Sequence, residues 1–310
     1  NGTLTVKAAS TPSTPSSGSS SGSSTTTKTE TTTNPDGSVT KTETRSDGTV
    51  IETTTNPDGS TSKTESKTTT KSNGSTVETV TETNTGADGS KSTSKTETTT
   101  AKDGSKTETK SETKTEAHGT KSETKSETKT DANGVTSGTE TTKTTAPNGS
   151  TGTTTTTTEN GNTKTEAEAK VSEKAIEDAK KSGEAVKVPT EVKAGENSDS
   201  APTVKVELPK NAGETKIEIP VSDVNSGTVA VIVHPDGTEE IVKDSKPTAD
   251  GVQLTVDGSA TVKIIDNSKD FHDTRDHWSR DEVNFVVARE LFNGVGNNLF
   301  GVGQPMTRGR

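Results

Sequence analysis

The side chains best suited to chemistry gather in one short stretch near the C-terminal end of the sequence. His272, Asp273, Asp276 and His277 lie within six residues of one another, and all four carry atoms that can bind a metal ion. Polar residues in such density are also typical of a loop that leads into a helix. We favour the loop, so the sequence predicts no metal site and no cofactor.

No catalytic group of residues stands out elsewhere. His118 and His234 both fall in turn sequences, and neither lies near a Gly-x-Ser-x-Gly nucleophile element. The glycine pairs at 294–296 and 301–303 lack the preceding strand and the lysine of a phosphate-binding loop. The sequence therefore predicts no catalytic residues and no enzyme activity for this stretch of chain.

The distribution of apolar side chains shows which part of the sequence can form a folded core. Only 21% of the 310 residues are hydrophobic and 2% are aromatic. Folding has to offset about 1–2 kcal/mol of backbone entropy per residue, mainly through apolar burial. Apolar residues are nearly absent before position 165 and recur in short runs after it. We therefore expect an α+β, mostly β chain with one small core in its C-terminal half.

Charge and cysteine content limit the partners. The net charge is −10, with lysine and glutamate interspersed, whereas nucleic-acid binding needs a clustered basic face. No stretch approaches the ~20 apolar residues of a membrane-spanning helix. Cysteine is absent, which excludes disulfides and thiolate metal sites. We expect no nucleic-acid partner, no membrane insertion and a monomeric fragment.

A polar repeat occupies most of the N-terminal half. Residues 1–27 contain the end of an upstream strand and a Ser/Thr/Pro linker, and residues 28–162 contain the repeat. Turn glycines recur every eleven residues from Gly37 to Gly59 and every fifteen from Gly59 to Gly149. Most form Asn-Gly or Asp-Gly pairs, which favour tight turns and lack the ligand series of a calcium loop. Thr alternates with Lys, Glu and Ser between the turns, which favours extended backbone.

A 15-residue period suggests a solenoid, but a solenoid needs an apolar column that recurs in every turn. Val77, Val80 and Val135 share no column, so the repeat has no core. Polar hairpins and an extended, disordered, low-complexity stalk remain as alternatives, and isolated hairpins are marginal in water. We favour the stalk, plain or glycosylated, over an ice-binding solenoid, because a flat threonine face needs a rigid core behind it.

Residues 163–268 read as a small β-rich domain with one short helix. The helix follows Ser172 as N-cap and stops at Gly183. Alternating apolar residues predict strands on both sides of the helix. The predicted strands span 163–171, 186–192, 204–208, 216–221, 228–233, 239–242, 252–256 and 260–265. The expected core residues are Val204, Val206, Ile217, Ile219, Val229, Val231, Ile241, Leu254, Val262 and Ile264.

Residues 269–310 read as a helix, a glycine-rich loop and the start of a second helix. Ser279 and Glu282 have the spacing of a capping box, and Trp278 is placed to pack on Val283 as a hydrophobic staple. Apolar positions from Val283 to Leu291 form a helical stripe that we expect to end at Gly294. Thr307 would cap the second helix.

This segment resembles the S-layer homology (SLH) module and contains most of one module. The resemblance rests on Phe271-x-Asp273, His277-Trp278, a helix, Asn293-Gly294, Phe300, Pro305 and Thr307-Arg308. The family has Thr-Arg-Ala-Glu where this chain has Thr307-Arg308-Gly309-Arg310. Such modules, three together, hold bacterial proteins to secondary cell-wall polysaccharide, an anionic glycan that is often pyruvylated. The resemblance implies that Arg308 is the glycan-binding cation and that Asp273 and Trp278 support it.

The chain starts at Asn1-Gly2-Thr3 and its last pattern is cut at Arg310, which predicts a C-terminally truncated fragment of a secreted, cell-surface protein. The leading expectation is a non-enzymatic spacer and wall-anchoring region. One alternative is an adhesin or binding module, in which residues 163–268 recognise a ligand at the end of the stalk. Another is the tether of an upstream secreted enzyme.

Overall fold

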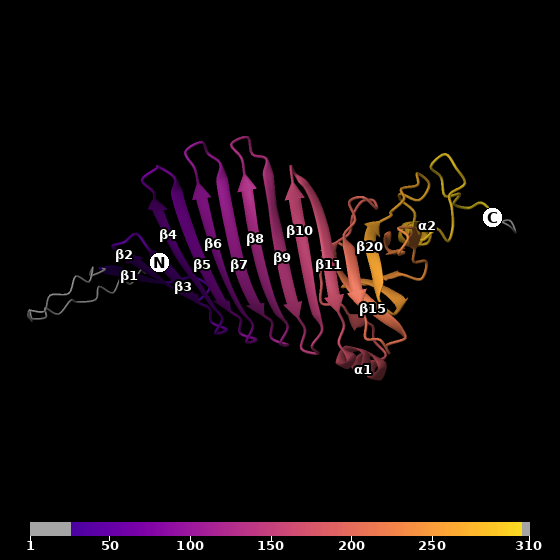
Figure 1. The fold of residues 1–310 in the computed structure, drawn as a ribbon, viewed down its shortest axis with the longest axis horizontal. Helices are drawn as coiled ribbons and strands as arrows, with labels where there is room; N and C mark the ends of the chain where they lie inside the picture. Colours follow the sequence, from indigo (N-terminus) through magenta and orange to yellow (C-terminus); the bar gives the residue numbers. More distant parts are fainter. Residues whose placement is uncertain (1–25, 306–310) are drawn as a thin grey trace, which may run out of the picture. The chain divides into compact units, whose positions relative to one another are not determined.

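The structure is a computed structural model that describes residues 26–305 (Figure 1). The chain divides into two compact units, residues 1–138 and 139–310, which are described separately. In the described residues strands far outnumber helices, of which there are two, α1 and α2. This confirms the prediction of a mostly β chain.

The first unit contains eight strands within its described residues, each paired antiparallel with the next. They are β1 (Thr27–Thr33), β2 (Val39–Arg45), β3 (Val50–Thr55), β4 (Thr61–Thr70), β5 (Thr76–Thr85), β6 (Lys91–Thr100), β7 (Lys106–Thr115) and β8 (Lys121–Thr130). The strand β9 (Thr136–Thr145) contains the division between the units. Figure 1 shows the eight strands following one another in chain order.

Tight turns join these strands, and the turn after β6 shows how the sequence forms them. Gly104 adopts a φ of +87°, which costs glycine little because it has no side chain. The Asp103 carboxylate accepts hydrogen bonds from the backbone N–H and the hydroxyl of Ser105, at 2.9 and 2.7 Å. Ala101 and Ser105 close the loop with a backbone hydrogen bond of 2.9 Å. An Asp-Gly-Ser sequence therefore specifies a three-residue hairpin loop.

Hydroxyl and charged side chains alternate from strand to strand on each face of this sheet. The even-numbered residues of β7 are all Lys or Glu, whereas those of β6 and β8 are all Ser or Thr. Even positions pair with even positions, as in Ser94↔Glu112 and Glu112↔Thr124. Residues directly opposite each other project from the same face. Each charged row on this face therefore lies between two hydroxyl rows, which keeps like charges from standing opposite each other.

Charges pair along a strand, two residues apart. Lys110 contacts Glu112 at 2.7 Å, and Lys129 contacts Glu127 at 2.9 Å. The spacing of two places both members on one strand face. All four side chains are substantially exposed, so each pair contributes at most about 1 kcal/mol.

In its described residues the repeat forms paired hairpins, the alternative to the extended, disordered stalk that the sequence favours. Ile51 and Val77 are the buried apolar side chains among the described residues of the first unit. The strands are held instead by backbone hydrogen bonds, by the turns and by cross-strand hydroxyl contacts such as Thr40 to Thr54 at 3.0 Å. Such contacts are weak singly, and the repetition of matched ten-residue strands sums them.

The second unit contains two sheets and two helices. One sheet has the spatial order β10 (Thr151–Glu159), β11 (Asn162–Lys170), β14 (Thr203–Glu207), β20 (Ala260–Asp266), β16 (Thr228–Val233) and β17 (Glu239–Ile241). The other has the order β12 (Val186–Lys187), β15 (Glu214–Ser222), β19 (Gly251–Asp257) and β18 (Lys246–Pro247), with β13 (Val192–Lys193) also paired to β15. The helices are α1 (Glu173–Ser182) and α2 (Arg280–Ala288).

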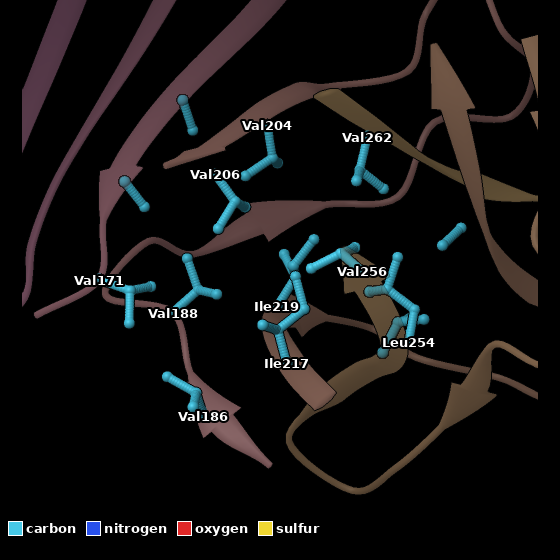
Figure 2. Packing of buried hydrophobic residues seen from close by; sticks show 14 of the residues in the cluster. Val171, Val186, Val188, Val204, Val206, Ile217, Ile219, Leu254, Val256 and Val262 are labelled. Carbon is cyan, nitrogen blue, oxygen red and sulfur yellow. The ribbon is translucent and has the colours of Figure 1, made fainter. Parts of the chain in front are cut away.

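The core of the second unit lies between these sheets (Figure 2). Val204 faces Val262 across β14 and β20, and both are fully buried. Ile217 faces Leu254 across β15 and β19 in the other sheet. Alternation along each strand sends these side chains inward and the polar residues outward. The predicted core is confirmed for Val204, Val206, Ile217, Ile219, Leu254, Val262 and Ile264.

The strand β16 differs from the prediction because it is buried on both faces. Ala230 points into the core between the sheets, whereas Val229 and Val231 lie in a second cluster with Ala288 of α2. Ile241 packs at the edge of this second cluster. Val229 and Val231 are buried as predicted, whereas Ile241 is only partly buried. All three lie in the cluster that includes Ala288 of the C-terminal segment, a contact that an alternating pattern alone does not reveal.

Helix α1 begins and ends as the sequence predicts. The Ser172 hydroxyl accepts a hydrogen bond from the N–H of Ala175 at 3.1 Å, which caps the N-terminus. Gly183 takes the left-handed conformation, with φ +75°, and its N–H donates to the carbonyl of Ala179 at 2.8 Å. Ala175 and Ile176 form the buried face of the helix.

Candidate functional site

A small aromatic and aliphatic cluster holds residues 270–305 together. The rings of Phe271 and Phe300 lie 5.8 Å apart and are tilted by 55°. Val283 and Val287 of α2 pack in the same cluster. Gly294 passes so close that an added Cβ would lie 2.6 Å from the ring of Phe271. The cluster therefore fixes the start of the segment, the helix and the glycine-rich loop against one another.

Asp273 joins the start of the segment to the glycine-rich loop. Its carboxylate accepts backbone hydrogen bonds from Phe300, Gly301 and Val302 at 2.8, 2.8 and 2.9 Å. Partial desolvation acts to raise the pKa of Asp273, but these three bonds outweigh it and hold the pKa below its ordinary value. The residue is thus ionised at neutral pH, and its oxygens are occupied by the protein backbone.

The residues around the start of α2 depart from the expected pattern. Ser279 precedes the helix, but its side chain makes no capping hydrogen bond. The prediction of a capping box is therefore wrong. Its hydroxyl instead contacts Nδ1 of His277 at 2.8 Å. Trp278 is 83% exposed, which excludes the staple on Val283. The indole lies beside the His277 ring, at 5.4 Å between centroids.

Helix α2 ends earlier than predicted. It stops at Ala288, Glu290 takes a left-handed φ of +56°, and Leu291 is 47% exposed. Gly294 is therefore not the stop signal. Glycine is needed at this position because a side chain would collide with the ring of Phe271. The next turn is formed by Asn297 and Asn298, both with positive φ.

Arg289 is a structural residue that the sequence analysis missed. It is fully buried, and its guanidinium donates to the carbonyls of Ser245 at 2.6 Å, Thr228 at 2.9 Å and Ser226 at 3.1 Å. Burial lowers the pKa of Arg289 to about 10, so the group keeps its charge at pH 7. Backbone carbonyls, rather than a carboxylate, compensate the buried charge.

Asparagine side chains extend this contact between the C-terminal segment and the sheet. Asn284 of α2 donates to the hydroxyl of Ser226 at 3.0 Å. Asn267 donates to the carbonyl of Ala288 at 2.7 Å, at the end of the helix. Together with Arg289 and the cluster around Ala288, these bonds fix α2 on β16 and the neighbouring loops.

Of the three predicted binding residues, the structure describes two. Asp273 and Trp278 are described, whereas Arg308 and the Thr307 cap lie outside the described residues. Among residues 26–305, no group of three or more His, Asp or Glu side chains is arranged to hold a metal ion. Neither described helix has the length and apolarity that a membrane crossing requires.

The exposed apolar side chains are concentrated in this segment. Within the described residues, Trp278, Leu291, Phe292, Val295 and Val302 are at least 36% exposed. All four phenylalanines and the one tryptophan of the sequence lie between positions 271 and 300. The segment is therefore where this chain carries rings able to stack on a sugar.

Comparison with protein families gives a match for the C-terminal segment. Residues 270–309 match the family model of the S-layer homology domain. The search of curated proteins and the search of solved structures found no match. The S-layer homology domain is a non-catalytic anchoring module that binds cell-wall polymers in general. The chain therefore carries an S-layer homology domain at residues 270–309, which indicates a cell-surface protein anchored to the wall.

Proposed function

We propose that this chain is a spacer and wall-anchoring region in which residues 269–310 bind anionic secondary cell-wall polysaccharide. The match of residues 270–309 to the S-layer homology domain carries the proposal. The residues before 269 then act as the spacer and as the support on which the anchoring segment is mounted. In this proposal the repeat at 28–162 is the spacer, and the small β-rich domain at 163–268 is the support.

The proposed contacts divide the work between three residues. Arg308 supplies the cation, because its planar guanidinium can bind a sugar carboxylate through two parallel hydrogen bonds. Trp278, with 83% of its surface exposed, supplies a face for a sugar ring. Asp273 acts indirectly, because its carboxylate already holds the backbone of Phe300 to Val302. It positions the loop that leads towards Arg308.

The adhesin alternative has less support. Residues 163–268 contain no Phe, Tyr or Trp, so they offer no ring for sugar stacking. A single buried core fills the space between the two sheets. The proposal therefore places ligand binding in the anchoring segment and assigns residues 163–268 a supporting role.

Retention on purified cell walls tests the proposal. The full chain is incubated with walls that keep their secondary polysaccharide and with walls stripped of it, and retention should fall on the stripped walls. Arg308→Lys keeps the charge but loses the two-pronged geometry, so it should weaken retention, and Arg308→Ala should weaken it further. Added salt should lower retention as well.

Two further variants locate the contact. Trp278→Ala should reduce retention, because it removes an exposed ring and no buried packing. Arg45→Ala removes a cation of the repeat and serves as the matched control, with no expected effect. Equal retention on intact and stripped walls would exclude this ligand, and an unaffected Arg308→Ala would place the cation site elsewhere.

A further inference from the structure

The topology of the first unit determines how it responds to a stretching force. Within its described residues, each strand pairs only with the strands that precede and follow it in the chain. No connection crosses over another strand, so the edge strand can leave without disturbing the remaining pairs. The buried apolar residues here are Ile51 and Val77, which leaves most strand pairs without a shared core.

The chain enters the eight-stranded sheet at Thr27 and leaves it at Thr130, and both residues lie at the same end of the strands. Thr27, where β1 begins, pairs with Arg45 at the end of β2. Following the pairings through all eight strands, Thr130 at the end of β8 pairs with Lys106 at the start of β7, on the side where β1 begins. An even number of antiparallel strands requires this arrangement. The line from Thr27 to Thr130 therefore runs across the strands.

A pull along that line acts on one strand pair at a time. Hydrogen bonds in antiparallel sheets are perpendicular to the strands, so the pull is directed along them. The bonds nearest the pulled end carry the load first and open in sequence. A pull parallel to the strands would instead load every bond of a pair together. The unzipping direction is the weaker one for the same set of bonds.

We propose that the repeat is an extensible tether that lengthens under load by releasing one hairpin strand after another. The proposal rests on the spacer role proposed above, and it adds a mechanical function to it. Each fifteen-residue repeat covers about 5 Å of sheet when paired and about 50 Å when extended. Release of β1 to β8 thus turns a sheet of about 35 Å into a chain of over 300 Å.

The sequence pattern makes the extension reversible. Each turn carries its own hairpin signal, such as Asp103-Gly104-Ser105, so a strand can re-form next to its neighbour in the chain. Hairpins form in about 1–10 μs. The alternation of charged and hydroxyl rows disfavours pairing in a register that sets like charges opposite each other. The polar faces also give the released chain little tendency to aggregate.

The second unit is built to resist the same load. Its parallel pair β11–β14 joins strands that lie more than thirty residues apart in the chain, and β14 pairs in turn with β20. Apolar residues from both sheets are buried between them. Opening therefore requires many contacts to break together, so the repeat should yield first.

Single-molecule stretching of the full chain tests the tether. The chain has no cysteine, so Thr27→Cys and Thr130→Cys provide two unique attachment points for handles. We expect a series of small, reversible lengthening steps that begins at low force, each about 45–50 Å for a fifteen-residue repeat. Release of one strand leaves an odd number of strands and moves the pulled end to the opposite side of the sheet, so low-force and higher-force steps should alternate. A second pair of handles, at Thr27→Cys and Lys121→Cys, pulls diagonally to the strands, and lengthening should then start at a higher force.

A shortened chain provides the second test. Deleting residues 91–120 removes β6 and β7, keeps the number of strands even and should remove two steps. Release of the whole sheet in one step, or smooth extension from zero force, would overturn the tether. Equal onset forces for both pairs of handles would overturn it as well. These measurements involve no cell wall, so their failure would leave the anchoring proposal standing, and failed wall retention would leave the stretching result unchanged.

Discussion

The guanidinium carbon of Arg289 lies 3.8 Å from the centre of the Phe285 ring, one helical turn before it. The same side chain donates to the carbonyl of Phe285 at 3.0 Å and to the carbonyls of Ser245 and Thr228. A cation held between a ring and backbone oxygens has lost its water but few of its interactions. This arrangement gives the end of α2, and with it the anchoring segment, its support on β16 and the neighbouring loops.

Replacing Arg289 should loosen that support. Arg289→Met keeps similar volume but leaves the carbonyls of Ser245 and Thr228 without a donor, at a cost of about 1–3 kcal/mol for each group. Amide exchange of the full chain should speed up in α2 and in β16. Arg280→Met, at an exposed position of the same helix, is the matched control and should change little. Unchanged exchange in Arg289→Met would show that the contact is not holding the segment.

A charge in the core between the two sheets should destabilise the second unit. Ile219 is fully buried opposite Val252, so Ile219→Asp places an unpaired carboxylate between the sheets and should cost about 3–5 kcal/mol. Ile219→Val should cost only about 0.5–1.5 kcal/mol. Thr255→Asp adds the same charge on the exposed face of β19 and should stay within about 0.5 kcal/mol. Denaturant unfolding monitored in β15 and β19 measures all three, and a stable Ile219→Asp would mean that the buried face is assigned wrongly.

The glycine-rich loop should depend on the charge of Asp273. The pKa of this carboxyl is lower in the folded chain than its ordinary value of 3.8. Its stabilisation of the loop is therefore complete above the ordinary pKa and is lost as the pH falls below 3.8 through the folded pKa. Amide exchange at Phe300, Gly301 and Val302 should show protection at pH 5 that disappears at lower pH, relative to the general change in exchange rate.

An amide at the same position separates the charge from the size of the side chain. Asp273→Asn should reduce the protection of those three amides at pH 5, because a neutral amide is a weaker acceptor and brings an NH₂ group towards N–H donors. Asp276→Asn, at an exposed neighbour, is the control. Equal protection in Asp273→Asn and in the unmodified chain would reduce the role of the carboxylate to packing.

The sequence predicted correctly those elements whose structure depends on residues close to one another in the chain. Ser172 and Gly183 delimit α1 because a cap needs only its own turn of helix. The strand positions of Ile217 and Leu254 followed from alternation over a few residues. In these elements the physical cause and the sequence signal lie within about ten residues of each other.

The features that were missed depend on contacts between distant residues. Arg289 reads as an ordinary basic residue at the end of a helix, and only the fold brings it to Ser245 and Thr228. Trp278 has the spacing of a staple, but the apolar cluster around Val283 is already filled by Phe271 and its neighbours.

The pairing of the repeat also depends on residues that are distant in the sequence. Its register, however, follows from the positions of the turns. Pairing the strands through their turns places residues thirty apart, such as Glu97 and Glu127, on either side of Thr109. Only then do the hydroxyl and charged rows become visible. Because burial is the usual source of stability, the lack of an apolar core predicts disorder. In the structure the strands instead pair in a register that sets hydroxyl side chains opposite charged ones, and this matching takes the place of a core.

Substitution of Thr109 tests whether those rows matter. Thr109 lies directly opposite Glu97 on β6 and Glu127 on β8. Thr109→Glu would place three carboxylates in one row across neighbouring strands, whereas Thr109→Lys would place a cation between two carboxylates. Direct cross-strand charge pairs are worth about 0.2–1 kcal/mol each, so the two variants should differ by about 1 kcal/mol or more. Amide exchange in β6 to β8 should be faster in Thr109→Glu and equal or slower in Thr109→Lys, and the difference should shrink with added salt. Identical exchange in both variants would mean that these strands are not paired in this register.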